Sequence, residues 1–125
     1  RLIIVAAALA LTGCVASAPE EMFAYQKPPS AALKAQIVNA AKDYLFDPFS
    51  VRDAEISSVM PLDKKRGLSV VCVKANARNQ MGGYTGRQAT SVRLMNGRIV
   101  NAIPNAPGCN DQRIDYRPFP ELERR

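Results

Sequence analysis

The stretch Leu68–Arg78 reads LSVVCVKANAR and decides the fold of this chain. Its apolar residues fall on both alternating faces: Val71 and Val73 share one face, and Val70 and Cys72 share the other. Apolar residues on both faces are typical of a strand at the centre of a sheet. We therefore expect Leu68–Arg78 to be a central strand with neighbours on both sides.

Weaker strand patterns lie on either side of this stretch. Val51–Met60 precedes it with imperfect alternation, and the charged segment Pro61–Gly67 is expected to form the turn between them. Strand patterns at Arg87–Met95 and Arg98–Ile103 follow it, joined by Asn96-Gly97, a pair favoured in type I′ hairpin turns. About four antiparallel strands are therefore expected.

One helix is expected before these strands. Ser30 is a favourable N-cap, and Leu33 and Ile37 begin an apolar stripe at helical spacing that continues to about Phe46. Asp47-Pro48 should end the helix, because a residue before proline is disfavoured in the α region. The fold class is therefore α+β: one N-terminal helix packed on a small antiparallel sheet of about four strands.

The N-terminal end has a different composition. An uncharged apolar run, Leu2–Ala10, leads into Leu11-Thr12-Gly13-Cys14. About ten helical residues reach roughly 15 Å, half the apolar thickness of a bilayer, so a membrane-spanning helix is disfavoured. This stretch resembles the lipobox of bacterial lipoprotein precursors. The resemblance implies that residues 1–13 are a cleaved signal peptide and that Cys14 carries diacylglycerol and an added acyl chain such as palmitate.

The resemblance also implies a location and a domain organisation. Val15 follows the cysteine in place of Asp, which in Gram-negative sorting favours the outer membrane, facing the periplasm; a Gram-positive host would retain the protein on the plasma membrane. Residues 14–29 then form the lipidated N-terminus and a proline-containing tether, whose aromatic residues can dock on the domain. Residues 30–110 form the α+β domain, and residues 111–125 form an extended C-terminal tail.

Composition limits the partners. Among 125 residues, 17 Lys and Arg against 11 Asp and Glu give a net charge of +6, with basic clusters only at Lys64-Lys65-Arg66 and Arg124-Arg125. An anionic envelope polymer or membrane surface is a candidate partner, and a solubilising charge is the simpler interpretation. No nucleic-acid recognition motif is present, so we expect no nucleic-acid partner.

The three cysteines divide by role. If Cys14 carries lipid, Cys72 and Cys109 remain in a compartment where disulfides persist, so we expect a bridge between them. Two free thiols are the alternative. A metal site formed by two cysteines is less favoured, because the chain contains no histidine to complete it.

The inventory of catalytic residues is small. Without histidine there is no Ser-His or Cys-His nucleophile pair. Asp53 and Glu55 are two apart on an expected strand and share a face. A pair of carboxylates is what a glycosidase uses, but a solvated strand face is the better interpretation. We therefore expect no enzymatic activity and no cofactor.

The segment Asn79–Gly86 stands out as a long glycine-rich loop. An exposed tyrosine is an effective interface anchor, because it offers a large contact area and has few rotatable side-chain bonds to fix on binding. The candidate binding residues are the glycines, the tyrosine and the flanking arginines: Gly82, Gly83, Gly86, Tyr84, Arg78 and Arg87. The alternative is a simple connector with Tyr84 folded back on the core.

A second resemblance rests on Asp47-Pro48-Phe49-Ser50 and on Asn76-Ala77-Arg78-Asn79 followed by Gly82–Gly86. These motifs resemble Asp-Pro-x-Ser and Asn-Ala-Arg-Asn…Gly-Gly-Tyr-x-Gly in small secreted proteobacterial domains. The resemblance covers roughly residues 33–100 and implies a domain without an assigned activity. The order of elements is also similar to that of small lipoprotein subunits of the outer-membrane barrel-assembly machinery, in architecture only.

These observations together predict an outer-membrane lipoprotein. Its periplasmic domain is expected to bind an envelope protein or an anionic polymer, as an accessory component of an envelope assembly. The alternative is an inhibitor or binding module that presents the loop Gly82–Gly86 to an envelope hydrolase such as a lysozyme.

Overall fold

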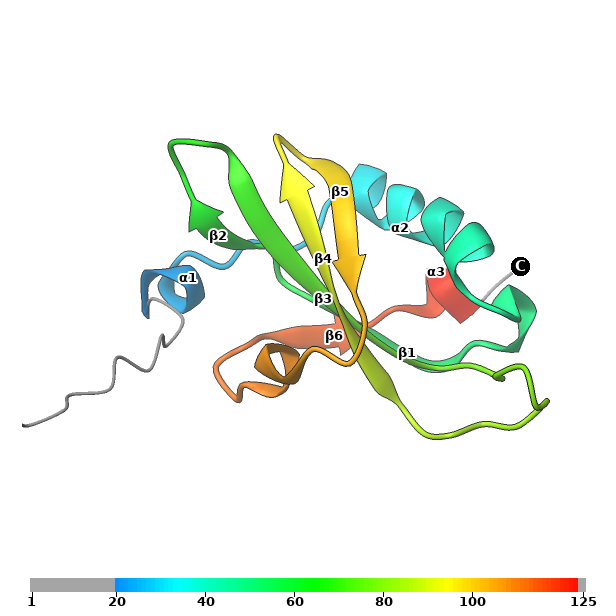
Figure 1. Cartoon of the computed structure of the whole chain (residues 1–125). Coiled ribbons are helices and arrows are strands. Elements are labelled where there is room, and N and C mark those ends of the chain that lie inside the picture. The colour runs from blue at the N-terminus through cyan, green and yellow to red at the C-terminus, as the bar shows by residue number, and fades with distance from the viewer. Residues whose placement is uncertain (1–19, 124–125) are drawn as a thin grey trace, which may run out of the picture.

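The computed structural model of the chain describes residues 20–123 (Figure 1). The fold is α+β, as expected, with helices packed on a single antiparallel sheet. Its elements in chain order are α1 (Glu20–Ala24), α2 (Ala31–Tyr44), the 3₁₀-helix η1 (Pro48–Ser50), β1 (Arg52–Ser57), β2 (Met60–Asp63), β3 (Leu68–Asn76), β4 (Gln88–Met95), β5 (Arg98–Ile103), the 3₁₀-helix η2 (Pro107–Asn110), β6 (Tyr116–Pro118) and α3 (Pro120–Glu123).

The central position of β3 is confirmed. The strand order is β5-β4-β3-β1-β6, and β2 also pairs with β3. Along one edge β3 pairs with β4 from Leu68, opposite Met95, to Ala75, opposite Gln88. Along its other edge it pairs first with β2 and then with β1. The sheet has six strands rather than about four.

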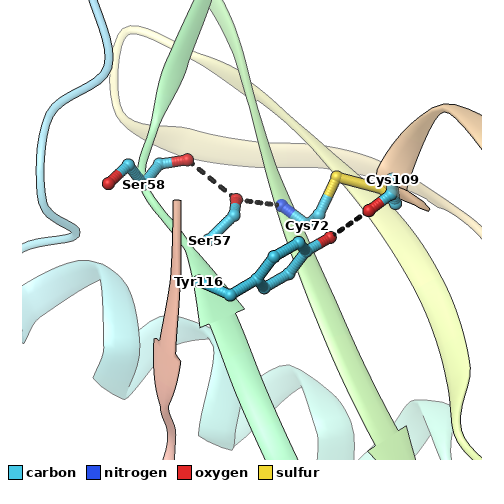
Figure 2. Close-up of a disulfide and its surroundings, with 5 residues drawn as sticks. All are labelled: Ser57, Ser58, Cys72, Cys109 and Tyr116. Carbon is cyan, nitrogen blue, oxygen red and sulfur yellow. Dashed lines mark hydrogen bonds between the residues drawn. A yellow bond between two sulfur atoms is a disulfide. The ribbon is translucent and has the colours of Figure 1, made fainter. Parts of the chain in front are cut away.

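One of the extra strands arises because the expected strand Val51–Met60 is interrupted. The buried Ser57 hydroxyl donates to the carbonyl oxygen of Ser58 (2.7 Å) and accepts from the backbone N–H of Cys72 (2.8 Å) (Figure 2). The backbone N–H of Ser58 donates to Asp115 instead of to β3. The Ser57 hydroxyl thus accepts a backbone hydrogen bond from β3 at the point where backbone pairing is interrupted. As a result, β1 and β2 are separate strands.

The expected helix is present as α2, and its N-cap is confirmed. The Ser30 hydroxyl accepts from the backbone N–H of Leu33 (3.1 Å). Leu33, Ile37 and Ala41 are buried against the sheet, whereas the helix ends at Tyr44, two residues before the expected end. Within residues 20–123, no helix combines the length and apolar character needed to cross a bilayer.

The expectation of an extended tail at 111–125 is wrong for the part that the structure describes, residues 111–123. β6 pairs with β1, and Phe119 and Leu122 are buried in the main core with residues of α2. Figure 1 shows α3 close to α2. The sequence signal was missed because β6 has three residues and α3 has four, too few to show periodicity. Pro118 and Pro120 further obscured it.

Part of the expected tether also belongs to the domain. Met22 in α1 is buried with Met60 and Val70, and Lys27 forms a β-bridge with Val59. Residues 20–29 are therefore docked on the sheet. The expected signal peptide, the lipobox and Cys14 lie outside the described residues.

The sheet face opposite α2 is held by the disulfide Cys72–Cys109, which confirms the expected pair. The two Cα atoms are 5.7 Å apart, and both side chains are buried. The Tyr116 hydroxyl donates to the carbonyl oxygen of Cys109 (Figure 2). Burial raises the pKa of Tyr116 to about 12.

Candidate functional site

The two sequence motifs, Asp47–Ser50 and Asn76–Gly86, meet in the structure. The Ser50 hydroxyl accepts from the backbone N–H of Arg78 (2.8 Å) and donates to the Asp47 carbonyl oxygen (2.7 Å). The Ser50 carbonyl oxygen accepts from the Tyr84 hydroxyl (2.6 Å). We call these hydrogen bonds of Ser50 with Arg78 and Tyr84 the Ser50 latch; it joins η1 to the glycine-rich loop.

The loop itself is closed by Asn79. The Asn79 side-chain oxygen accepts from the backbone N–H groups of Met81 (2.9 Å) and Gly83 (3.3 Å), and the Asn79 backbone N–H donates to the Gly83 carbonyl oxygen (3.0 Å). Gly82 has a φ of +79°, a left-handed conformation that glycine adopts without steric cost. Hydrogen bonds to Asn79 therefore hold the loop in a defined conformation.

The structure places Tyr84 folded back on the domain. The side chain is half-buried, and the Arg52 guanidinium lies 3.6 Å from the ring centroid, with that of Arg78 at 5.6 Å. Arg87, the other flanking arginine, forms an ion pair with Glu55 instead. The residues predicted from the sequence as a binding loop are therefore only partly brought together. Arg78 lies beside the Tyr84 ring, whereas Arg87 is paired with Glu55.

Asp53 and Glu55 do not form the shared strand face expected from their spacing. A bulge interrupts the pairing of β1 with β3 between Arg52 and Glu55. Asp53 within it has a φ of +54°, outside the β region. In the described part of the chain, no group of three or more His, Cys, Asp or Glu side chains is placed to hold a metal ion.

Beside the latch, a groove of about 300 Å³ opens between the C-terminal end of α2 and the sheet. Both walls carry alanines where larger side chains would close the gap between the layers. Its lining includes five alanines, Ala40, Ala41, Ala75, Ala77 and Ala102, among larger apolar residues such as Ile37, Leu45, Val73, Val92 and Ile99. Arg78, Asn79 and Gln88 add polar atoms where it meets the loop. We call this the α2–sheet groove.

Exposed apolar side chains lie in the groove lining and on the two segments that the latch joins. Phe46 lines the groove and is 65% exposed, Phe49 in η1 is 77% exposed, and Met81 in the loop is 91% exposed. Sequence reasoning missed both phenylalanines. A usable signal was present: aromatic residues on either side of Asp47-Pro48 lie in a turn, where they have no strand or helix face to bury.

The groove combines apolar and polar lining groups. An apolar floor with a guanidinium and amide groups at its mouth matches an apolar peptide segment that carries an acidic group. The exposed phenylalanines and the methionine extend this surface beyond the groove. Such side chains are enriched in the cores of protein interfaces.

Tyr84→Phe tests the latch. Removing the hydroxyl leaves the Ser50 carbonyl without its donor, which should cost about 0.5–1.5 kcal/mol locally. We expect faster amide hydrogen exchange at residues 79–83 and an almost unchanged melting temperature. Tyr44→Phe is the matched control, because the Tyr44 hydroxyl makes no side-chain hydrogen bond to residues 20–123. Equal exchange in both variants would show that the latch does not order the loop.

Comparisons of the chain with protein-family models, with curated proteins and with solved structures find no match. The features of the molecule that bear on function are the groove, the hydrogen-bonded loop beside it, and the exposed side chains of Phe46 and Phe49.

Proposed function

We propose that the protein is an envelope lipoprotein, anchored in the outer membrane through acylated Cys14, whose periplasmic domain binds a partner protein. The anchor is supported by the sequence Leu11-Thr12-Gly13-Cys14 that follows the apolar run. The binding role is supported by the α2–sheet groove and by the exposed side chains of Phe46, Phe49 and Met81, which we call the rim. The domain would act as an accessory component of an envelope assembly.

The proposed occupant of the groove is an apolar segment of the partner with an acidic residue beside it. Apolar side chains fit the alanine-lined floor, and the acidic residue pairs with Arg78 at the mouth. The amide groups of Asn79 and Gln88 can hydrogen-bond a peptide backbone. Phe49 and Met81 extend the contact beyond the groove, so a surface larger than one small ligand is engaged.

The alternative function is inhibition of an envelope hydrolase such as a lysozyme. The observation in its favour is the ordered loop, which projects at the lower right of Figure 1 with Met81 at 91% exposure. A preorganised loop loses little conformational entropy on entering a cleft. Inhibition of purified lysozymes by the wild type, and its loss in Met81→Ala, would support this alternative over the accessory role.

Site-specific photocrosslinking in cells tests the groove. A photoreactive phenylalanine analogue at position 46 or 49 is expected to crosslink to one envelope protein. The same analogue at Met95, an exposed residue at the other end of β4, is not. Ala77→Leu, which fills the groove, should reduce the yield at position 46 about tenfold. A melting curve verifies that Ala77→Leu is folded.

Two results would overturn the proposal. If positions 46, 49 and 95 give the same crosslinked products, the rim has no specific partner. If a folded Ala77→Leu protein crosslinks at position 46 as well as the wild type, the groove is not the contact. The anchor is tested separately by mass spectrometry of the N-terminal peptide from membranes, where an unmodified Cys14 would exclude acylation.

A further inference from the structure

Two hairpin turns lie side by side at one end of the sheet (Figure 1). The backbone N–H of Asn96, in the β4–β5 turn, donates to the carbonyl oxygen of Gly67, in the β2–β3 turn (2.9 Å). Gly67 has a φ of +67°, and a Cβ there would overlap the Asn96 side-chain oxygen. Glycine therefore permits the close approach that joins the two turns.

This contact gathers basic side chains from separate parts of the sequence. The β2–β3 turn supplies Lys64, Lys65 and Arg66, and β5 begins with Arg98; all four are exposed. We call these four residues the basic tip. Asp63 is the acidic residue within the basic tip. Its carboxylate accepts hydrogen bonds from the backbone N–H groups of Lys65 and Arg66 and forms an ion pair with the Arg66 side chain (3.6 Å).

The basic tip lies close to where the chain leads to Cys14. Lys64 Nζ lies 3.8 Å from the ring centroid of Tyr25, which follows α1, and α1 packs on β2. Glu20 follows Cys14 by six positions, so the connecting chain reaches at most about 20 Å. Cys14 embedded in a bilayer would therefore keep the basic tip near the headgroups.

We infer that the basic tip binds anionic lipid headgroups of the membrane that holds Cys14. The position of the tip near the bilayer rests on the proposed function, in which Cys14 is the membrane anchor. The attraction itself comes from the exposed Lys and Arg side chains. Clustered Lys and Arg beside a lipid anchor are attracted to anionic lipids within about one Debye length. The half-exposed Tyr25 adds an aromatic ring suited to the membrane interface. Glu20 and Glu21 of α1 are the acidic groups on the neighbouring element, and they partly oppose this attraction.

Binding at this tip orients the domain. The nine residues of β3 extend about 30 Å from the basic tip toward the glycine-rich loop. The Ser50 latch and the mouth of the groove at Arg78 therefore lie at the end of the molecule away from the bilayer. A partner protein would meet them without competition from lipid.

Vesicle co-sedimentation tests the inference with the mature chain, residues 14–125, carrying Cys14→Ser and therefore no acyl group. We expect binding to phosphatidylglycerol-containing vesicles, little binding to phosphatidylcholine vesicles, and loss of binding at high salt. Lys65→Gln/Arg98→Gln, with one cation from each side of the tip, should weaken binding roughly tenfold or more. Lys42→Gln/Arg87→Gln, which removes the same charge outside the tip, is the matched control.

Equal weakening by the two double variants would overturn the inference, because overall charge would then explain binding. Absence of binding to anionic vesicles would also overturn it. Neither outcome depends on whether Cys14 is acylated in cells, since the tested chain has no acyl group. Failure of the anchor is detected separately, by an unmodified Cys14 in the mass spectrum.

Discussion

Phe119→Ala is expected to lower the free energy of unfolding by about 3–5 kcal/mol. The Phe119 side chain is completely buried in the main core, and truncation leaves a cavity that the surrounding side chains cannot fill. The total stability of a domain of this size is about 5–15 kcal/mol, so the variant should be marginal at 37 °C. Urea unfolding followed by circular dichroism measures the loss.

Phe49→Ala is the matched control for this experiment. Phe49 is 77% exposed, so the same truncation should change stability by no more than about 0.5 kcal/mol. A Phe119 variant that unfolds at the same urea concentration as the Phe49 variant would show that the C-terminal segment is not part of the core.

Cys72→Ala/Cys109→Ala is expected to cost about 4 kcal/mol of stability. The bridge joins residues 37 apart, and on the loop-entropy account a closed loop of that length restricts the unfolded chain by this amount. Replacing both cysteines avoids leaving one unpaired thiol. The midpoint of urea unfolding measures the effect.

A reducing agent provides the internal comparison for this variant. It should lower the midpoint of the wild type toward that of the double variant and leave the double variant unchanged. Identical midpoints for the untreated wild type and the double variant would contradict a stabilising bridge.

Much of the fold was predictable because its signals are local. The alternation within Leu68–Arg78 identified the central strand, and Ser30 identified the start of α2. The disulfide followed from a count of cysteines. Where the physics is not local, prediction failed: the break after Ser57 depends on a side-chain hydrogen bond to Cys72 in another strand.

The candidate site shows the same division. Composition identified the glycine-rich loop, but the direction of Tyr84 depends on Ser50, 34 residues earlier in the chain. Alanines are ordinary filling in a helix or a strand, so nothing in the sequence shows that alanines of α2, β3 and β5 face a common groove. That arrangement follows from the packing of two layers.

The pairing of β6 with β1 has a consequence for the order of assembly. The outer edge of β1 receives β6 some 60 residues later in the chain, and α3 then adds the bond from Ala54 N–H to the Glu123 carboxylate (2.9 Å). The outer edge of β1 therefore stays open until residues 116–123 pack against it. Such non-local closure slows folding, and an open edge invites mispairing. Among the described residues, the last strand in sequence order is the one that closes this edge of the sheet.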